Sequence, residues 1–117
     1  EITLDETRMF LSLRKKKLLK ELERIKKELL EKYHPLRIIL FGSLSTGRVR
    51  ENSDIDLVIV KDTNKTFIDR AIEVALLTRP NLAIDFIVYT PEEFKHMESQ
   101  NNYFFKEITK GKVIYAE

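Results

Sequence analysis

The sequence contains no cysteine and has only 3 glycines, 3 prolines and 2 histidines. Without cysteine, the protein has neither disulfide bonds nor thiolate metal sites. The few glycines and prolines, together with 43% hydrophobic and 34% charged residues, exclude a low-complexity or fibrous chain and indicate an ordered globular domain. Because no hydrophobic run is long enough for a membrane span or a signal peptide, we expect a soluble, cytoplasmic protein with no membrane partner.

A large excess of charge of either sign is also absent. The 21 Lys and Arg residues nearly balance the 19 Asp and Glu residues, which leaves a formal net charge of +2. So small an excess does not indicate nucleic-acid binding, and we expect no direct contact with nucleic acid. At 117 residues the chain is long enough for one domain with its own core, so we treat residues 1–117 as a single domain.

A long amphipathic helix is predicted for residues 1–34. Apolar residues recur at helical spacing and form one stripe before Pro35 ends the pattern: Leu11, Leu18, Leu22, Ile25 and Leu29. Such a helix, roughly 40 Å long, exceeds one face of so small a domain, so its free part is available to a partner or to a second copy of the chain. Its basic run Arg14–Lys17 is either a phosphate-binding face or a solvated surface.

The remaining residues alternate short β-branched runs with helical patterns. We expect four strands, in the segments "LRIILF", "DIDLVIV", "LAIDFIVY" and "KVIY". The helix between the second and third strands carries one apolar face formed by Phe67, Ile68, Ile72, Ala75 and Leu76. Thr90 and Pro91 begin a further helix, and Gly111 ends the last one. This order predicts an α/β (α+β) fold in which helices flank a small mixed β-sheet.

Three aspartates stand in or beside strands that otherwise predict burial. Asp54 and Asp56 open the second strand and project on one face, because alternate side chains of a strand point the same way. Asp85 lies inside the third strand, where we expect it to be buried with a cationic partner. Any one of these acids could instead cap a turn or pair with an arginine. If the two strands are neighbours, however, the three carboxylates converge and suit Mg²⁺, or Mn²⁺ as the second choice.

A Gly42-Ser43 turn follows the first predicted strand. Small residues there allow backbone amides to approach a phosphate and to begin a short helix. The spacing to Gly47 matches a P-loop, but Arg48 and Val49 stand where that motif requires Lys and Ser or Thr, so a P-loop is excluded. An EF-hand is excluded as well, because a valine occupies the third ligand position after Asp54 and Asp56.

The whole segment "GSLSTGRVRENSDIDLVIV" resembles the signature of the nucleotidyltransferase superfamily that includes DNA polymerase beta. It is most similar to the minimal nucleotidyltransferase (MNT) branch. The matching positions are Gly42, Ser43, Gly47, Ser53, Asp54, Asp56 and Leu57. The resemblance extends over about residues 36–115 and implies a polymerase beta palm-like fold. In that fold, residues 36–117 would form the catalytic core and residues 1–34 the N-terminal helix.

By resemblance, the protein would transfer a nucleoside monophosphate, AMP from ATP, to a hydroxyl of a protein or small molecule and release pyrophosphate. Three acids would be catalytic and would hold two Mg²⁺ ions: Asp54, Asp56 and Asp85. Asp85 would also help to deprotonate the acceptor. The nucleotide would contact Gly42, Ser43, Ser53 and Arg48. Arg48 and its neighbour Arg50 either neutralise the triphosphate or are solvated loop charges. Many relatives carry an arginine where this chain has Thr46, which removes one phosphate contact.

The same resemblance implies a protein partner. MNT proteins are commonly encoded beside a small helical HEPN protein, and in toxin–antitoxin pairs the MNT member is the antitoxin. In some pairs it attaches AMP to a tyrosine of the HEPN protein. We therefore expect a HEPN-type partner. The alternative is a non-catalytic binding module that neutralises such a partner by contact alone.

Overall fold

The computed structural model describes all of residues 1–117 and measures 52 × 31 × 24 Å along its principal axes. Helices and strands follow one another in the order α1 (Leu4–Lys32), β1 (Arg37–Phe41), α2 (Ser43–Thr46), β2 (Ile55–Val60), α3 (Phe67–Thr78), β3 (Ile84–Tyr89), α4 (Pro91–Gln100), α5 (Tyr103–Thr109) and β4 (Lys112–Ala116). The order and type of the predicted elements are confirmed. None of the helices combines the length and the apolar character needed to cross a membrane.

The four strands form one mixed sheet in the order β3-β2-β1-β4. β1 pairs antiparallel with both β2 and β4, whereas β2 and β3 are parallel and are joined through α3. A small mixed sheet flanked by helices was the predicted architecture. The strand order has one consequence for the site: β3 is an edge strand, so only one of its sides is paired.

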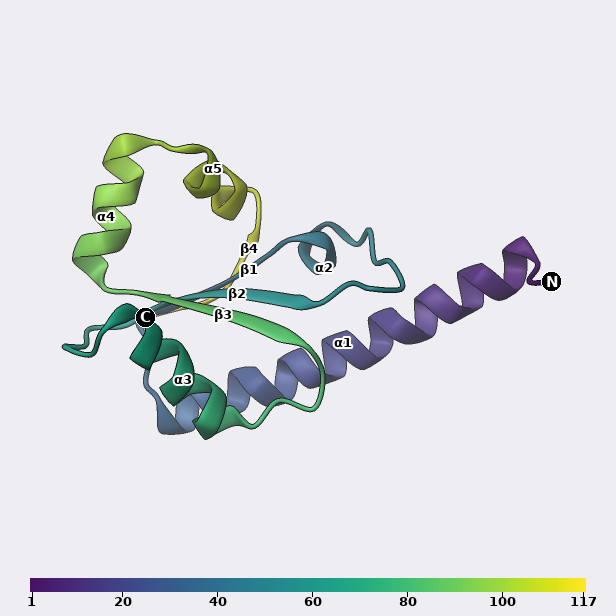
Figure 1. Ribbon diagram of the computed structural model, residues 1–117, viewed down its shortest axis with the longest axis horizontal. Coiled ribbons are helices and arrows are strands. Elements are labelled where there is room, and N and C mark those ends of the chain that lie inside the picture. The colour runs from purple at the N-terminus through teal and green to yellow at the C-terminus, as the bar shows by residue number, and fades with distance from the viewer.

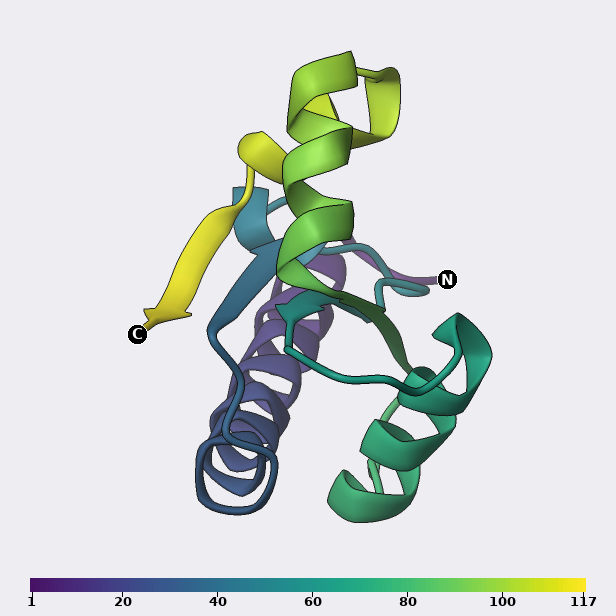
Figure 2. The ribbon, with the colours of Figure 1, turned by 90° about the vertical axis from the view of Figure 1, so that its left-hand side faces the viewer.

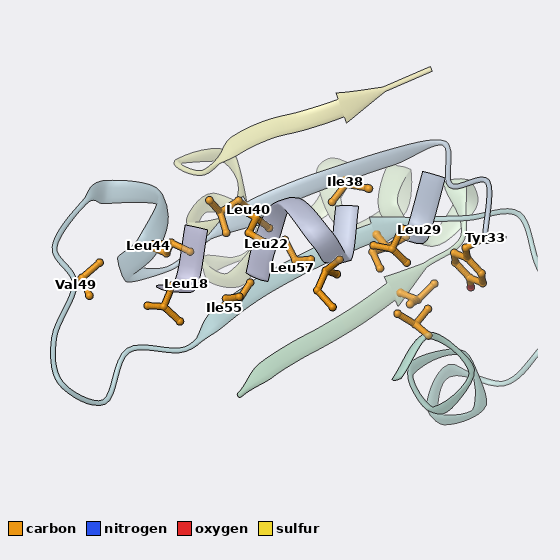
Figure 3. Close-up of a cluster of buried hydrophobic side chains, with 14 residues drawn as sticks. Leu18, Leu22, Leu29, Tyr33, Ile38, Leu40, Leu44, Val49, Ile55 and Leu57 are labelled. Atoms are coloured by element: carbon orange, nitrogen blue, oxygen red, sulfur yellow. The ribbon is translucent and has the colours of Figure 1, made fainter. Parts of the chain in front are cut away.

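Helices cover both faces of the sheet, with α1 and α3 on one side and α4 and α5 on the other (Figure 2). The larger core lies between the sheet and α1, where the leucines of α1 face strand residues such as Ile38, Ile55 and Leu57 (Figure 3). A smaller core on the other face is built around Ile39, Val58 and Ile108. The thinner packing on that face leaves room for a cleft at one end of the sheet.

Helix α1 packs on the sheet only through its second half. Its buried residues, Leu18, Glu21, Leu22, Ile25 and Leu29, include four of the five residues of the predicted stripe, whereas Leu11 is half-buried. Thr3 caps the start, accepting a hydrogen bond from the amide of Glu6. Figure 1 shows the first half of α1 extending beyond the sheet. The prediction that part of this helix is free of the domain is therefore confirmed.

Helix α1 is tied to the turn between α3 and β3 by a polar cluster. The Glu21 carboxylate accepts from Arg24 Nε at 2.8 Å and from the backbone amide of Asn81. Arg24 in turn donates to the carbonyls of Thr78 at 3.0 Å and Arg79 at 3.1 Å. Hydrogen bonds from Arg24 and then from Asn81 outweigh the effect of burial and lower the pKa of Glu21 to about 2. The cluster fixes α1 against the end of α3.

The apolar face predicted for α3 points to solvent. Ile68 and Leu76 are each 69% exposed and Ile72 is 51% exposed, whereas Val74 and Thr78 are buried. The helix packs on α1 and β3 through the side that carries Val74 and Thr78. The buried Thr78 hydroxyl has a hydrogen-bond partner, because it donates to the carbonyl of Val74 at 2.8 Å. The periodicity therefore identified a real apolar face but not the face that is covered.

Helices α4 and α5 complete the second layer. Thr90 and Glu93 form a capping box at the start of α4, and Pro91 occupies the first turn as predicted. Phe105 of α5 is buried and meets Phe94 of α4 edge to face, with ring centroids 5.5 Å apart. This packing places α5 over the end of β1, and its polar side reaches the cleft described next.

Candidate functional site

The predicted acids gather at one end of the sheet, where β1 ends and β2 and β3 begin. Asp56 is paired in register with Phe41 of β1 on one side and with Asp85 of β3 on the other. Because neighbouring strands lie about 4.8 Å apart and registered side chains share a face, Asp56 and Asp85 point together toward the layer of α4 and α5. Asp54 precedes the first residue of β2 by one position.

The environment of Asp56 disfavours its ionised form. The pKa of Asp56 is raised to about 6, first by burial, then by the charge of Asp85, by a hydrogen bond shared with Asp85, and by the charge of Asp54. No ion pair relieves this crowding, because none of the salt bridges in the structure involves these three acids. The cluster therefore lacks a positive charge of its own.

The prediction that Asp85 is buried with a cationic partner is wrong. Its side chain is exposed and its nearest charged neighbour in the sheet is another acid, Asp56. The reason is the position of β3 at the sheet edge, where residues at the open end of the strand keep contact with water. Solvent, rather than a cation, accommodates the Asp85 carboxylate.

Gly42 brings the turn after β1 directly against Asp56. Its φ of 76° lies in the left-handed region, and a Cβ at this position would overlap the Asp56 carboxylate, lying 3.2 Å from its Cγ. The chain then forms α2, which ends at Gly47 with a φ of 78°. Ser45 braces the turn by donating from Oγ to the carbonyl of Gly42 at 2.7 Å. The short helix predicted after Gly42 is confirmed.

The two serines of the motif meet across the loop that joins α2 to β2. Ser43 donates from Oγ to Ser53 Oγ at 2.9 Å, and Ser53 Oγ also accepts from the Arg50 amide at 2.6 Å. Ser53 is only 6% exposed, so it holds the loop in shape. Ser43 is more accessible and faces the cleft.

A polar cleft of about 450 Å³ opens between this loop and α5. None of its lining residues is hydrophobic: Gly42, Ser43, Ser45, Thr46, Arg48, Arg50, Asn52, Ser53, Asp54, Asp56, Glu107 and Lys110. Six of the seven predicted site residues are among them. The exception is Asp85, which lies beside Asp56 but outside the lining.

Four of the lining residues were not singled out from the sequence. Ser45 lies in α2 and Asn52 in the loop that follows it. Glu107 and Lys110 come from the end of α5, where they form an exposed ion pair at 3.2 Å. Nothing local marks Glu107 and Lys110, since charged residues at a helix end are common. They reach the cleft only because the aromatic residues of α5 pack over the end of β1.

Helix α1 also touches the site loop, residues 47–54, which joins α2 to β2. Arg14 donates from Nη2 to the carbonyl of Ser53 at 3.0 Å, and its Nε is buried without a partner. Lys15 Nζ lies 3.6 Å from the place that a Cβ on Gly47 would occupy. The basic run Arg14–Lys17 is thus divided: Arg14 anchors the loop, while Lys16 and Lys17 are exposed.

The acids fit a metal that is completed by its substrate. As they stand, no group of three or more Asp, Glu, His or Cys side chains could hold a metal ion. Mg²⁺, however, is commonly bound by one or two carboxylates together with water and substrate phosphate oxygens. Asp56 and Asp85 offer two such carboxylates side by side, and Asp54 adds negative charge beside them. The donor set is compatible with Mg²⁺.

Comparisons with known proteins agree with this geometry. The family model described as "Polymerase beta, Nucleotidyltransferase" matches residues 23–117. The fold is similar to a 1.40 Å crystal structure of a provisionally assigned nucleotidyltransferase from Sulfolobus solfataricus, with a TM-score of 0.62 and 21% identity over 88% of this chain and 84% of that chain. No curated protein matched the sequence. Since the family model spans most of the chain, including the cleft, the protein belongs to the polymerase beta nucleotidyltransferase family.

Proposed function

We propose that the protein is a metal-dependent nucleotidyltransferase that moves AMP from ATP to a hydroxyl of a protein or a small molecule in the cytoplasm. The observation that carries the proposal is the polar cleft, which joins the motif acids, the Gly42-Ser43 turn and several cations on one surface. In the reaction, the acceptor oxygen would form a bond to the α-phosphorus, and the bond from that phosphorus to the bridging oxygen of the β-phosphate would break to release pyrophosphate.

The donor side of the cleft would hold the triphosphate. Ser43 and the Gly42 amide would contact the β- and γ-phosphates, with Ser53 keeping the loop in place through its hydrogen bond to Ser43. Arg48 and Arg50 both line the cleft and take part in none of the ion pairs of the structure, so they are available to phosphate oxygens. This favours the triphosphate-neutralising interpretation of the two arginines over the solvated one.

The acid side would hold Mg²⁺, or Mn²⁺, through Asp54, Asp56 and Asp85. When bound, two such ions would stabilise charge on the attacking and leaving oxygens of the displacement. Asp85 is exposed beside Asp56, so its carboxylate can accept the proton of an incoming acceptor hydroxyl. Asp56, by contrast, is half-buried, and its carboxylate lies directly against Gly42.

The acceptor is proposed from the resemblance to MNT proteins, which suggests a tyrosine hydroxyl on a HEPN-type partner. The cleft itself supports a large acceptor, because it is open to solvent. A partner protein bound across the cleft would supply both the hydroxyl and a cover over the site.

A non-catalytic antitoxin that neutralises its partner by contact is the second candidate. The observation in its favour is that the acids do not form a ready metal-binding group in this structure. In that case the cleft would be a contact surface, and its acids would serve no transfer step.

A labelling experiment separates the two candidates. The protein is incubated with Mg²⁺, ATP labelled on its α-phosphate, and the helical protein encoded by the adjacent gene. We expect label on the partner and release of pyrophosphate, and we expect both to disappear when Asp54→Ala and Asp56→Ala are combined. Because Asp62 and Asp69 are exposed and lie outside the cleft, Asp62→Ala combined with Asp69→Ala is the matched control that should retain transfer.

The opposite result has a clear meaning. Suppose that neither the wild type nor the Asp54→Ala, Asp56→Ala variant transfers label, and that the variant still neutralises the partner fully. The contact-only candidate then replaces the catalytic one.

A further inference from the structure

The free half of α1 carries a second apolar face that nothing in the structure covers. Met9, Phe10 and Leu13 are 66%, 51% and 53% exposed. At 3.6 residues per turn, Met9 lies roughly 180° around the helix from Leu18, the first residue buried against the sheet. Met9 therefore points away from the body of the protein, whereas Phe10 lies on the flank of the helix, in a groove shared with Glu51 of the loop between α2 and β2. All three apolar side chains are accessible to another molecule.

The residues along this face follow the spacing of a coiled-coil seam. Positions recur at alternating intervals of three and four residues, and all five are exposed: Glu6, Met9, Leu13, Lys16 and Lys20. An interval pattern of this kind keeps one side of a helix facing a neighbouring helix. Two apolar positions lie at the centre of the seam, with an acid on one side and bases on the other.

The order of charges along the seam matches an antiparallel copy of the same helix. If residue 11 of one chain lies opposite residue 11 of the other, Met9 faces Leu13 twice at the centre, and Glu6 faces Lys16 at each end. A parallel arrangement would instead place Glu6 against Glu6 and Lys16 against Lys16, which is unfavourable. Phe10 lies beside the central pair and adds apolar area.

The receiving surface is already hollowed. A groove of about 640 Å³ runs beside Phe10 and Leu13 and is lined by four bases and one acid: Arg14, Lys16, Lys17, Lys20 and Glu51. The first turn of α1 contains the acids Asp5 and Glu6. The acidic turn of one copy thus has a basic, partly apolar groove to enter on the other copy.

We propose that two copies of this chain associate through the first halves of their α1 helices, packed antiparallel. Nucleic acid fits the surface less well, because it would use the cations but leave Met9, Phe10 and Leu13 exposed, and the net charge of the chain is only +2. The buried stripe of each α1 remains on its own sheet, so the two bodies lie on opposite sides of the paired helices without displacing core contacts.

Sedimentation velocity or light scattering over a rising concentration series tests the proposal. The wild-type chain is expected to pass from 13.9 kDa to twice that mass in the micromolar to submillimolar range. Leu13→Glu should shift the midpoint to at least about tenfold higher concentration, because it places an acid in the apolar centre. Since Leu13 is half exposed, the variant should keep the circular dichroism spectrum of the folded protein.

A charge exchange identifies the pairing. Glu6→Lys alone and Lys16→Glu alone should each weaken the dimer, and the two combined should restore it, because each end of the seam then regains an opposite pair. Glu23→Lys combined with Lys27→Glu, at exposed positions of α1 beyond the seam, is the matched control and should leave the dimer unchanged. A chain that stays at 13.9 kDa at every concentration overturns the proposal, and so does a dimer indifferent to Leu13→Glu and to both single charge reversals.

Discussion

Gly42 meets two separate constraints at the point where β1 enters the cleft. Its φ of 76° is costly for any residue with a side chain, and the space that a Cβ would occupy is filled by the Asp56 carboxylate. Gly47, at the other end of α2, shares the first constraint with a φ of 78° but not the second, since its nearest neighbour is Lys15 Nζ at 3.6 Å. The two glycines therefore form a natural comparison.

Replacing Gly42 by alanine should affect both stability and the site. We expect Gly42→Ala to lower the free energy of unfolding by more than the roughly 1–2 kcal/mol of backbone strain, because Asp56 must also move. Gly47→Ala should cost the strain alone. Denaturant unfolding measures both losses, and equal losses would show that Asp56 yields without cost.

The lowered pKa of Glu21 predicts acid sensitivity. Its pKa falls from 4.5 to about 2 on folding, chiefly because Arg24 donates to its carboxylate, so the unfolded chain takes up this proton at higher pH than the folded one. The resulting stabilisation is complete above pH 4.5 and is lost as the pH falls toward about 2. Urea unfolding across this window should show a flatter pH dependence for Glu21→Gln than for wild type. Glu23→Gln, at an exposed position on the same helix, should follow the wild-type curve.

Among the secondary-structure elements, α1 has two halves with different roles. Its second half covers the sheet, while Arg14, in the first half, binds the loop that carries Ser53 into the cleft. The family match begins at residue 23, so this contact lies outside the part shared with the family model. The helix thus adds a support to the site that the motif does not include.

Loss of that support should loosen the loop. In Arg14→Ala, the amides of Arg50 and Ser53 should exchange their hydrogens several-fold faster, because the bonds between these two residues lose the anchor at the Ser53 carbonyl. Hydrogen exchange read by mass spectrometry or NMR gives the measurement, with Lys27→Ala as a control on the same helix. Unchanged exchange in both variants would mean that Ser43 and Ser53 hold the loop unaided.

Helix α3 shows the limit of periodicity at this scale. The spacing of Ile68, Ile72 and Leu76 correctly indicates a helix with an apolar face, yet that face is the exposed one. Periodicity reports which residues share a side, whereas burial depends on where the neighbouring elements lie. Val74 and Thr78 are buried because α1 and β3 meet the other side of the helix.

For the whole molecule, the cleft is built by segments far apart in the chain and stays open. The loop after β1 forms one wall and the end of α5 the other. Binding of Mg²⁺ and ATP is therefore expected to stabilise the existing fold, because both walls already belong to the packed domain.

Thermal unfolding tests this expectation. Mg²⁺ together with ATP should raise the Tm, since only the folded state holds the complete site, and the gain should be about 2.7 kcal/mol at a ligand concentration one hundred times Kd. ATP with a chelator should raise it less. Asp56→Asn should abolish the added effect of Mg²⁺, whereas Asp62→Asn, beyond the far end of β2, should not. An equal rise in both variants would place the ligand elsewhere.

The sequence alone determined the order of the elements, the Thr90 cap of α4 and the projection of Asp54 and Asp56 on one face at the start of a strand. These follow from short-range causes: side-chain alternation, helical spacing and turn residues. The grouping of Gly42, Ser43 and Ser53 with these acids came from the resemblance to the nucleotidyltransferase signature. The paired register of Asp56 and Asp85 then required only that β2 and β3 be neighbours.

Only the tertiary structure decided the rest. It exposed Asp85 by placing β3 at the sheet edge, and it turned the apolar face of α3 toward solvent. It also brought Arg14 to the Ser53 carbonyl and Lys110 to the wall of the cleft. The physical reason is that strand order and helix placement depend on how the whole set of apolar surfaces is best buried. A residue's own neighbours in the chain carry no information about that choice.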